Sequence, residues 1–183
     1  MAAGKGTRMK SLRPKVLHRL GGRALAQHVI DCAARLSARS VVVITGHGAE
    51  QVENGLVTPA THPGSGLTLR YVRQEPQLGT GHAVQQAVPV LPDDGVVLVL
   101  NGDVPLIEPE TLNDLLQACN DRHLALLSVD TGRDAGSYGR VVRTSDGAVQ
   151  AIVEFKDASE AQRGITEWYS GVMAAPARLL KTW

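Results

Sequence analysis

Residues that could bind phosphate gather at the start of the sequence. Gly4 and Gly6 flank Lys5, and Arg8 and Lys15 follow within the same short segment. Glycines let backbone N–H groups approach an anion closely, and the cationic side chains add positive charge. The spacing excludes a Walker A loop, and the residue at position 9 is not the glycine that a dinucleotide-binding loop needs. The alternative is a basic surface loop at the start of a helix.

A second group of residues could read a nucleotide base. Gln74 is followed by a Gly79-Thr80-Gly81-His82 segment. A side-chain amide offers a hydrogen-bond donor and an acceptor side by side, and glycines let backbone groups reach the same ring. The alternatives are that Thr80 is a helix N-cap, that the glycines are turn residues, and that His82 is an ordinary helix histidine.

Carboxylates form two further groups. Asp103 follows the apolar segment 96–100, and a carboxylate at the end of a buried strand is placed to hold Mg²⁺ together with phosphate oxygens and water. A turn aspartate is the alternative. Gly139, Glu154 and the segment 167–171 could fix sugar hydroxyls or an amide, although each of these residues alone is typical of an ordinary hairpin.

The composition indicates one domain that can bury a core. The chain has 183 residues, of which 43% are hydrophobic, and its net charge is +1. A core of Val, Leu, Ile and Ala is typical of helices packed on a parallel sheet. The balanced charge argues against nucleic-acid or membrane-surface partners, and the apolar runs are too short to span a membrane. Cys32 and Cys119 are predicted to be buried thiols in a reducing compartment.

Helix-like and strand-like segments alternate along the chain, which predicts an α/β fold with a mostly parallel sheet flanked by helices. Ligands of such sheets lie beyond the carboxyl ends of the strands, where the glycine and acid clusters fall. The predicted helices cover residues 23–36, 79–88 and a segment from 109. The predicted strands cover 40–45, 67–73, 95–100 and 124–129. Residues 140–144 and 148–154 are predicted to form a β-hairpin, and 58–66 a surface loop.

Five ordered motifs carry a resemblance to one family. They read AAGKGTRM from residue 2, PKVLH from 14, QLGTGHA from 77, GDVPL from 102 and YGR from 138. Together they resemble the N-terminal uridylyltransferase domain of the bacterial bifunctional N-acetylglucosamine-1-phosphate uridyltransferase/glucosamine-1-phosphate acetyltransferases. The resemblance covers essentially the whole chain. It implies a Rossmann-like nucleotidyltransferase fold with a hairpin insertion near the sugar site.

The resemblance also implies an activity and a set of site residues. The activity is transfer of uridylyl from UTP to N-acetylglucosamine-1-phosphate, which gives UDP-N-acetylglucosamine for cell-wall and lipopolysaccharide synthesis in the cytoplasm. Arg8 and Lys15 would act on the triphosphate, Asp103 would bind Mg²⁺, and Gly139 and Glu154 would hold the sugar. The residues implied to hold UTP or UDP are Ala2, Ala3, Gly4, Lys15, Gln74, Gly79 and Thr80.

The sequence departs from the family in three ways. Tyr169 stands where the family has an Asn that contacts the sugar substrate. The family's domain continues past residue 183 with an Asn that completes the magnesium site. Its C-terminal β-helix, which transfers acetyl groups and forms trimers, is absent from the sequence.

We therefore expect residues 1–183 to be an incomplete uridylyltransferase domain with little turnover by itself. In the family an apolar strand leads into Ala2, so a gap flanked by unpaired strand edges is expected in the sheet. Two other functions stay open. One is a nucleotidyltransferase for another sugar-1-phosphate, and the other is a nucleotide-binding remnant without catalysis.

Overall fold

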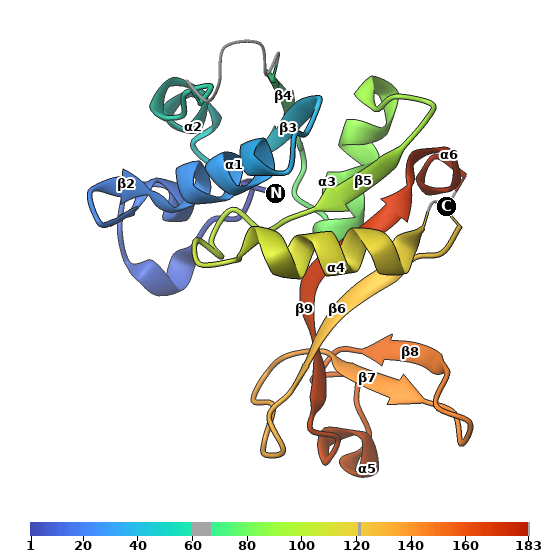
Figure 1. The fold of residues 1–183 in the computed structure, drawn as a ribbon. Helices are drawn as coiled ribbons and strands as arrows, with labels where there is room; N and C mark the ends of the chain where they lie inside the picture. Colours follow the sequence, from blue (N-terminus) through green and yellow to red (C-terminus); the bar gives the residue numbers. More distant parts are fainter. Residues whose placement is uncertain (60–66, 121, 183) are drawn as a thin grey trace.

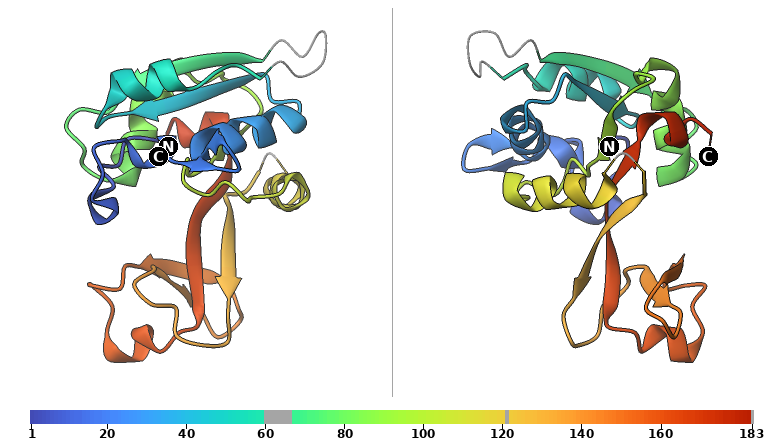
Figure 2. Two further views of the ribbon diagram at one scale, coloured as in Figure 1. Left: turned by 90° about the vertical axis from the view of Figure 1, so that its left-hand side faces the viewer. Right: turned by 45° about the vertical axis from the view of Figure 1, so that its right-hand side comes forward.

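Two long strands join a larger α/β part to a smaller β-rich part (Figure 1). The computed structural model describes residues 1–59, 67–120 and 122–182, so most of the predicted loop 58–66 lies outside the described residues. The two strands are β6 (Ala125–Asp130) and β9 (Glu167–Pro176). They run from the larger part into the smaller one in both views of Figure 2.

The larger part contains a parallel strand pair of β-branched residues. β3 (Ser40–Thr45) pairs in parallel with β4 (Thr68–Arg73), and Val43 lies opposite Tyr71. Both strands lie within a residue of their predicted bounds. Val43, Ile44 and Thr45 are buried, so the carboxyl end of β3 is its most deeply covered part. This is the end at which the predicted ligand site was placed.

The remaining strands of the larger part are organised around β9. β5 (Val96–Val99) and β6 both pair antiparallel with β9, so β5 and β6 run in the same direction as each other. The prediction of a mostly parallel sheet is correct for the direction of these two strands. It is wrong for their pairing, because the unpredicted strand β9 lies reversed between them.

Met1 and Ala2 connect the two groups of strands. The Ala2 N–H donates to the Ile44 carbonyl, and Ala2 bridges Thr45 in parallel. The Met1 α-amino group donates to the Leu100 carbonyl, and the Met1 carbonyl accepts from the Gly102 N–H. These two hydrogen bonds join Met1 to residues 100 and 102, which is the hydrogen-bond pattern of two parallel strands. The strands β3, β4, β5 and β6 therefore share one direction.

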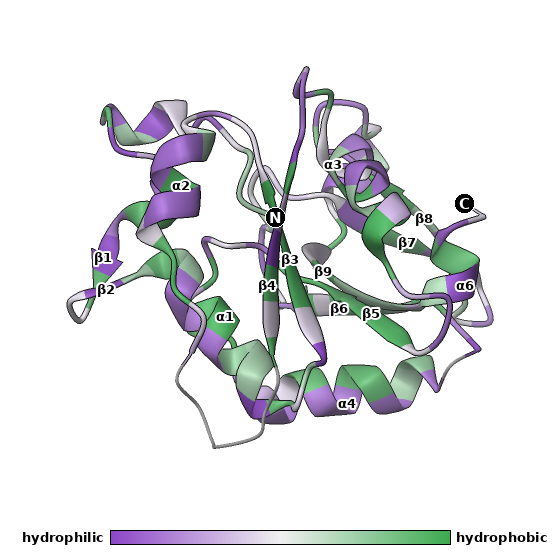
Figure 3. Ribbon diagram, turned by 90° about the horizontal axis from the view of Figure 1, so that it is seen from above, coloured by the Kyte–Doolittle hydropathy of each residue, from purple (hydrophilic) through white to green (hydrophobic). Residues whose placement is uncertain are grey.

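Helices cover both faces of these strands. On one side, α1 (Leu25–Arg35) packs beside α4 (Pro109–Cys119), and Cys32 and Cys119 are buried there, as predicted. On another face of β3, α3 (Thr80–Ala87) contributes Ala83 and Ala87. Hydrophobic and hydrophilic residues alternate along α4 in Figure 3, as expected for a helix with one buried face. No helix among the described residues is long and apolar enough to cross a membrane.

Shorter elements complete the larger part. The predicted helix 23–36 begins two residues late, because residues 23–24 form a strand instead. The short elements are β1 (Arg19–Leu20), β2 (Arg23–Ala24), α2 (Ala49–Gly55), α6 (Ala177–Leu180) and the 3₁₀ turns Thr7–Met9, Lys15–Leu17 and Val88–Val90.

The smaller part is the predicted hairpin with one helical turn. β7 (Arg140–Arg143) pairs antiparallel with β8 (Val149–Val153), and Arg140 also lies opposite Trp168 of β9. α5 (Glu160–Arg163) begins with a capping box, in which the side chains of Ser159 and Gln162 each bond the other's backbone N–H. The hairpin is therefore attached to the larger part through β9.

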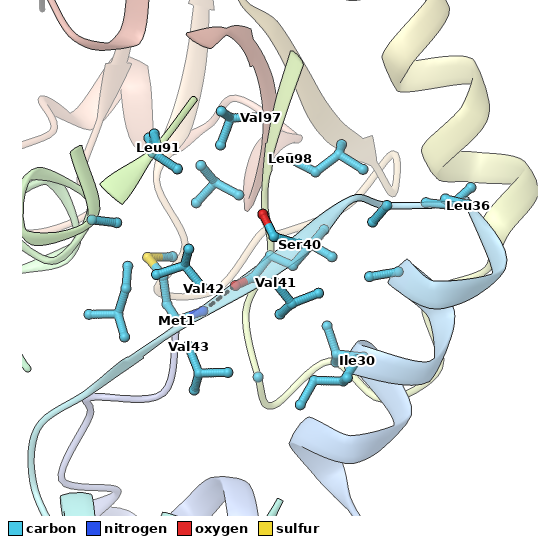
Figure 4. A pocket seen from close by; sticks show the side chains of 18 of the residues that line it. Met1, Ile30, Leu36, Ser40, Val41, Val42, Val43, Leu91, Val97 and Leu98 are labelled. Carbon is cyan, nitrogen blue, oxygen red and sulfur yellow. Dashed lines mark hydrogen bonds between the residues drawn. The ribbon is translucent and has the colours of Figure 1, made fainter. Parts of the chain in front are cut away.

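An apolar cavity of about 360 Å³ lies between β3 and β5. Its lining includes Val41–Ile44 and Val96–Leu100 (Figure 4). Among the described residues, β3 pairs on one edge with β4 and β5 on one edge with β9, and Met1 and Ala2 make the contacts between their other edges. Burial lowers the pKa of the Met1 α-amino group to about 6, against the opposing effect of the Asp103 charge.

Candidate functional site

An ion pair joins the first predicted cluster to the third. Lys15 begins the 3₁₀ turn Lys15–Leu17, and its ammonium contacts the carboxylate of Asp103, just beyond β5. Both side chains are partly open to solvent, with exposed fractions of 40% and 32%. The sequence separates them by 88 residues, and the common direction of the strands brings them together. The structure therefore places a cation beside the predicted magnesium ligand.

The glycine loop lies against Lys15. Gly6 has a φ of 57°, and a β-carbon on it would lie 2.8 Å from the Lys15 β-carbon. Gly4 faces open space, so its backbone can be approached closely. Arg8 is exposed in the turn Thr7–Met9 and makes no ion pair within the described part of the chain. Its charge is therefore available to an anion.

The second predicted cluster is also assembled. Gln74 is buried, with 3% of the residue exposed. Its amide nitrogen donates to the Gly79 carbonyl at 2.9 Å and lies 3.2 Å from His82 Nδ1. Gly79, with a φ of 107°, is the N-cap of α3, and no side chain caps that helix. Thr80 is the first helical residue, so the alternative of a Thr80 N-cap is wrong.

Gly46, directly after the predicted strand 40–45, connects this cluster to the glycine loop. A β-carbon on Gly46 would lie 2.8 Å from the Gln77 amide nitrogen and 2.9 Å from the Ala3 β-carbon. Ala2 and Ala3 are both buried beside it. The residues predicted to hold the uridine thus meet at the carboxyl end of β3. A glycine directly after a predicted buried strand was the available signal.

The predicted sugar-binding residues come together in the smaller part. The Tyr169 N–H donates to the Gly139 carbonyl at 2.9 Å. A β-carbon on Gly139 would lie 3.6 Å from a Glu154 carboxylate oxygen. The Tyr138 ring stacks on Trp168 with centroids 4.2 Å apart, and burial raises the pKa of Tyr169. Gly139, Glu154 and Tyr169 therefore form one cluster of a backbone, a carboxylate and aromatic rings.

A β-bulge links the sugar cluster to Asp103. β9 skips Ser170 and Gly171 in its pairing with β6, and Gly171 has a φ of 81°. The Asn101 side chain donates to the Ser170 carbonyl at 3.3 Å, two residues before Asp103. Bulges commonly occur beside active sites, where they redirect a strand. Sequence reasoning missed Asn101, because its partner lies in a strand that was not predicted.

The charges of the two parts differ. The first 30 residues contain no Asp or Glu, and their cationic residues are Lys5, Arg8, Lys10, Arg13, Lys15, Arg19 and Arg23. In the smaller part, two hydrogen bonds from Arg143 hold the pKa of Glu167 down to about 2, assisted by one from Ser128. The glycine loop is therefore the anion-attracting side of the site.

The carboxylate of Asp103 suits a metal ion that takes most of its ligands from water and substrate. No group of three or more His, Cys, Asp or Glu residues that could hold a metal occurs within the described ranges. Asp103 offers one partly exposed carboxylate. Mg²⁺ commonly takes one or two carboxylates and completes its shell with water and substrate phosphates. Asp103 therefore fits such an ion when a phosphate is bound beside it.

Taken together, a glycine loop, exposed cations and a carboxylate at the carboxyl ends of strands define a nucleotide-binding α/β enzyme domain. Residues 1–172 match the family described as the MobA-like NTP transferase domain. The chain belongs to this family of nucleotidyltransferases.

Curated relatives extend this finding along the whole chain. The chain is 63% identical over 186 residues to the "Bifunctional protein GlmU" of Polaromonas naphthalenivorans, covering 100% of this chain and 39% of that relative. It is 64% identical over 183 residues to the protein of that name from Albidiferax ferrireducens, with the same coverage. The resemblance inferred from the five motifs is confirmed. The chain spans about two fifths of the length of these relatives.

Solved structures agree on the fold. A UDP-glucose pyrophosphorylase complexed with UDP-glucose has a TM-score of 0.78 at 16% identity, over 98% of this chain and 75% of that one. HddC from Yersinia pseudotuberculosis has a TM-score of 0.67 at 19% identity, over 100% and 77%. The predicted α/β nucleotidyltransferase fold is thereby confirmed.

Proposed function

We propose that this chain forms the site for uridylyl transfer from UTP to N-acetylglucosamine-1-phosphate, which yields UDP-N-acetylglucosamine and pyrophosphate. The observation that carries the proposal is the contact between Lys15 and Asp103 beside the Gly4–Gly6 loop. The identity of 63–64% to bifunctional GlmU proteins supports the choice of substrates.

The residues act by positioning and by charge. An oxygen of the sugar phosphate attacks the α-phosphorus of UTP in line, and the bond to pyrophosphate breaks as the new P–O bond forms. Negative charge grows on the departing pyrophosphate, where Arg8 and Lys15 supply fixed positive charge. Gln74, Gly79 and Thr80 hold the uridine. No covalent intermediate on the enzyme is required, because holding both phosphates in line suffices for direct displacement.

Asp103 is the residue that would hold Mg²⁺. The ion would neutralise phosphate charge when bound. Lys15 then exchanges its carboxylate partner for a phosphate oxygen. Because the Lys15–Asp103 pair is partly exposed, separating the two charges costs little.

Gly139, Glu154 and Tyr169 would hold the sugar. Glu154 can accept hydrogen bonds from hydroxyl or amide groups, and the Gly139 backbone permits close approach. At position 169 a tyrosine ring replaces the amide side chain of the family, and the backbone N–H of Tyr169 donates to the Gly139 carbonyl. This replacement favours a second candidate, transfer to a different sugar-1-phosphate.

Pyrophosphate release by the 183-residue chain tests the proposal. We expect a low rate that requires UTP, N-acetylglucosamine-1-phosphate and Mg²⁺ together, and tighter binding of UTP than of ATP at equilibrium. Equal turnover with glucose-1-phosphate would favour the second candidate. Tight binding of UTP without any release of pyrophosphate would favour the non-catalytic alternative.

The remaining expectations are part of the same proposal. The location in the cytoplasm, the use of the product in cell-wall synthesis and trimer formation through a C-terminal domain rest on the resemblance to bifunctional relatives. Fractionation and sizing of the complete relatives would measure location and assembly separately from the transfer reaction.

A further inference from the structure

Arg140 is a fully buried guanidinium in the smaller part, and nothing in the proposed transfer reaction uses it. It is the one charged residue that is buried within the described part of the chain, and its side chain is 0% exposed. The carboxylate that it faces, Asp134, lies 3.5 Å away and is 84% exposed. A buried charge is costly unless its donors are satisfied, and a carboxylate so open to water offsets little of that cost.

Backbone carbonyls satisfy the guanidinium instead. One terminal nitrogen donates to the Tyr138 carbonyl, and the other donates to the Gly136 carbonyl at 2.9 Å. Nε and a terminal nitrogen both donate to the Arg163 carbonyl at 3.4 Å. The planar fork thus ties the turn before β7 to the end of α5. Lysine cannot reproduce several donors in one fixed plane.

The carbonyls held by Arg140 surround the proposed sugar subsite. Tyr138 and Arg140 are the two neighbours of Gly139 in the sequence, so the clamp fixes the backbone on both sides of that glycine. The Arg140 guanidinium also lies 5.3 Å from the centre of the Phe155 ring, and Phe155 directly follows Glu154. One buried side chain therefore contacts residues next to both Gly139 and Glu154 in the sequence.

We propose that Arg140 is a positioning residue that sets the geometry of the N-acetylated sugar subsite. It holds the backbone of Gly139 in a fixed position relative to Phe155, the residue next to Glu154. This inference rests on the proposed function, because it assumes that Gly139 and Glu154 contact the sugar. The Arg140 side chain itself is buried and does not touch substrate. We therefore expect Arg140 to affect the binding of the sugar and not the binding of the uridine, which binds at the carboxyl end of β3.

Equilibrium binding separates these two halves of the ligand. UDP lacks the sugar and has a free terminal phosphate in its place. Because variants in the smaller part leave the phosphate site unchanged, the change in the ratio of the two affinities between variants measures the sugar subsite. Trp168, stacked on Tyr138, is a fluorescent reporter there, and Trp183→Phe removes the other Trp. In that background, we expect Arg140→Lys to reduce the affinity ratio about tenfold, with the affinity for UDP unchanged.

Arg143→Lys is the matched control, because Arg143 lies on the same strand, is partly exposed and pairs with Glu167. It should leave the ratio unchanged. A second variant, Phe155→Leu, removes the ring without altering charge and should reduce the ratio about threefold. If Arg140→Lys does not fold, as judged by its thermal melt, Phe155→Leu decides the question.

An unchanged ratio in a folded Arg140→Lys chain overturns the positioning role, as does an equal loss of affinity for UDP and UDP-N-acetylglucosamine. Failure of the proposed function is distinguishable. In that case the parent chain itself would bind UDP-N-acetylglucosamine no more tightly than UDP, before any change at Arg140.

Discussion

Lys15 and Asp103 form an ion pair in which both side chains are open enough to solvent to bind a ligand. Each side chain is about a third or more exposed, so their ion pair contributes no more than about 1 kcal/mol to the free energy of unfolding. A β-carbon on Gly6 would lie 2.8 Å from the Lys15 β-carbon, so only a glycine leaves room for the Lys15 side chain there. A phosphate can therefore take Lys15 from Asp103 without disturbing the fold.

Replacing Lys15 with Ala separates phosphate binding from uridine binding. We expect Lys15→Ala to weaken UTP binding about tenfold or more and to leave uridine binding unchanged, because the lost contact is with phosphate. Titration calorimetry with both ligands measures the difference. Arg19→Ala removes the same charge from the basic segment outside the proposed site and is the control. Equal weakening of UTP and uridine by Lys15→Ala would contradict a phosphate role.

At the scale of elements, the bulge in β9 connects the part of the site around Asp103 to the predicted sugar-binding cluster. Gly171 lies in the bulge with a φ of 81°, and a β-carbon there would lie 2.5 Å from the Asn101 side-chain nitrogen. Asn101 follows β5 and precedes Asp103, while Tyr169 lies on the other side of the bulge. The bulge therefore couples the end of β5 to the strand that carries the sugar cluster.

We expect Gly171→Ala to lower the free energy of unfolding by about 3 kcal/mol, from backbone strain and from the clash with Asn101. Gly147→Ala is the matched control, because Gly147 has a φ of 87° and open space around its α-carbon. It should lose only the strain, about 1 kcal/mol. Urea denaturation measures both. Equal losses in the two variants would show that the Asn101 contact is unimportant.

The elements that the sequence predicted correctly are those whose patterns are local. β3 and the hairpin fall close to their predicted bounds, and α4 begins at its predicted start. β-branched runs, a proline at a helix start and a Ser-Asp-Gly turn each act within a few residues. β9 was missed because Ser170 and Gly171 interrupt its apolar run. Its strand conformation depends on partners on both sides, which a single segment cannot reveal.

The candidate site likewise contains residues that could be predicted from the sequence and one that could not. The glycine loop, Gln74 and Asp103 have residue types that suggest their chemistry in the sequence. Arg140 could not be recognised as a buried clamp, since arginine is usually exposed and its carbonyl partners include one 23 residues away. Contacts of that kind follow only from the assembled fold.

At the scale of the whole molecule, the chain's two groups of strands meet at Met1 and Ala2. These residues bond β3 on one side and the end of β5 on the other, and the apolar cavity lies beside them (Figure 4). The α-amino group is thus a titrating charge that lies between the two strand edges. Burial outweighs the nearby Asp103 carboxylate, so its pKa falls from 8.0 to about 6.

This lowered pKa predicts how stability depends on pH in the 183-residue chain with a free amino group at Met1. Between pH 8 and pH 6 the unfolded chain binds a proton at this group and the folded chain does not, so the free energy of unfolding rises with pH. The full change is about 2–3 kcal/mol and is complete above pH 8. Urea denaturation of the free and the N-acetylated chain, each at pH 6 and pH 8, isolates this effect, because both forms contain the same histidines. Acetylation should remove most of the difference in stability between the two pH values, and an identical difference in both forms would show that the folded chain carries a protonated, solvated amino group.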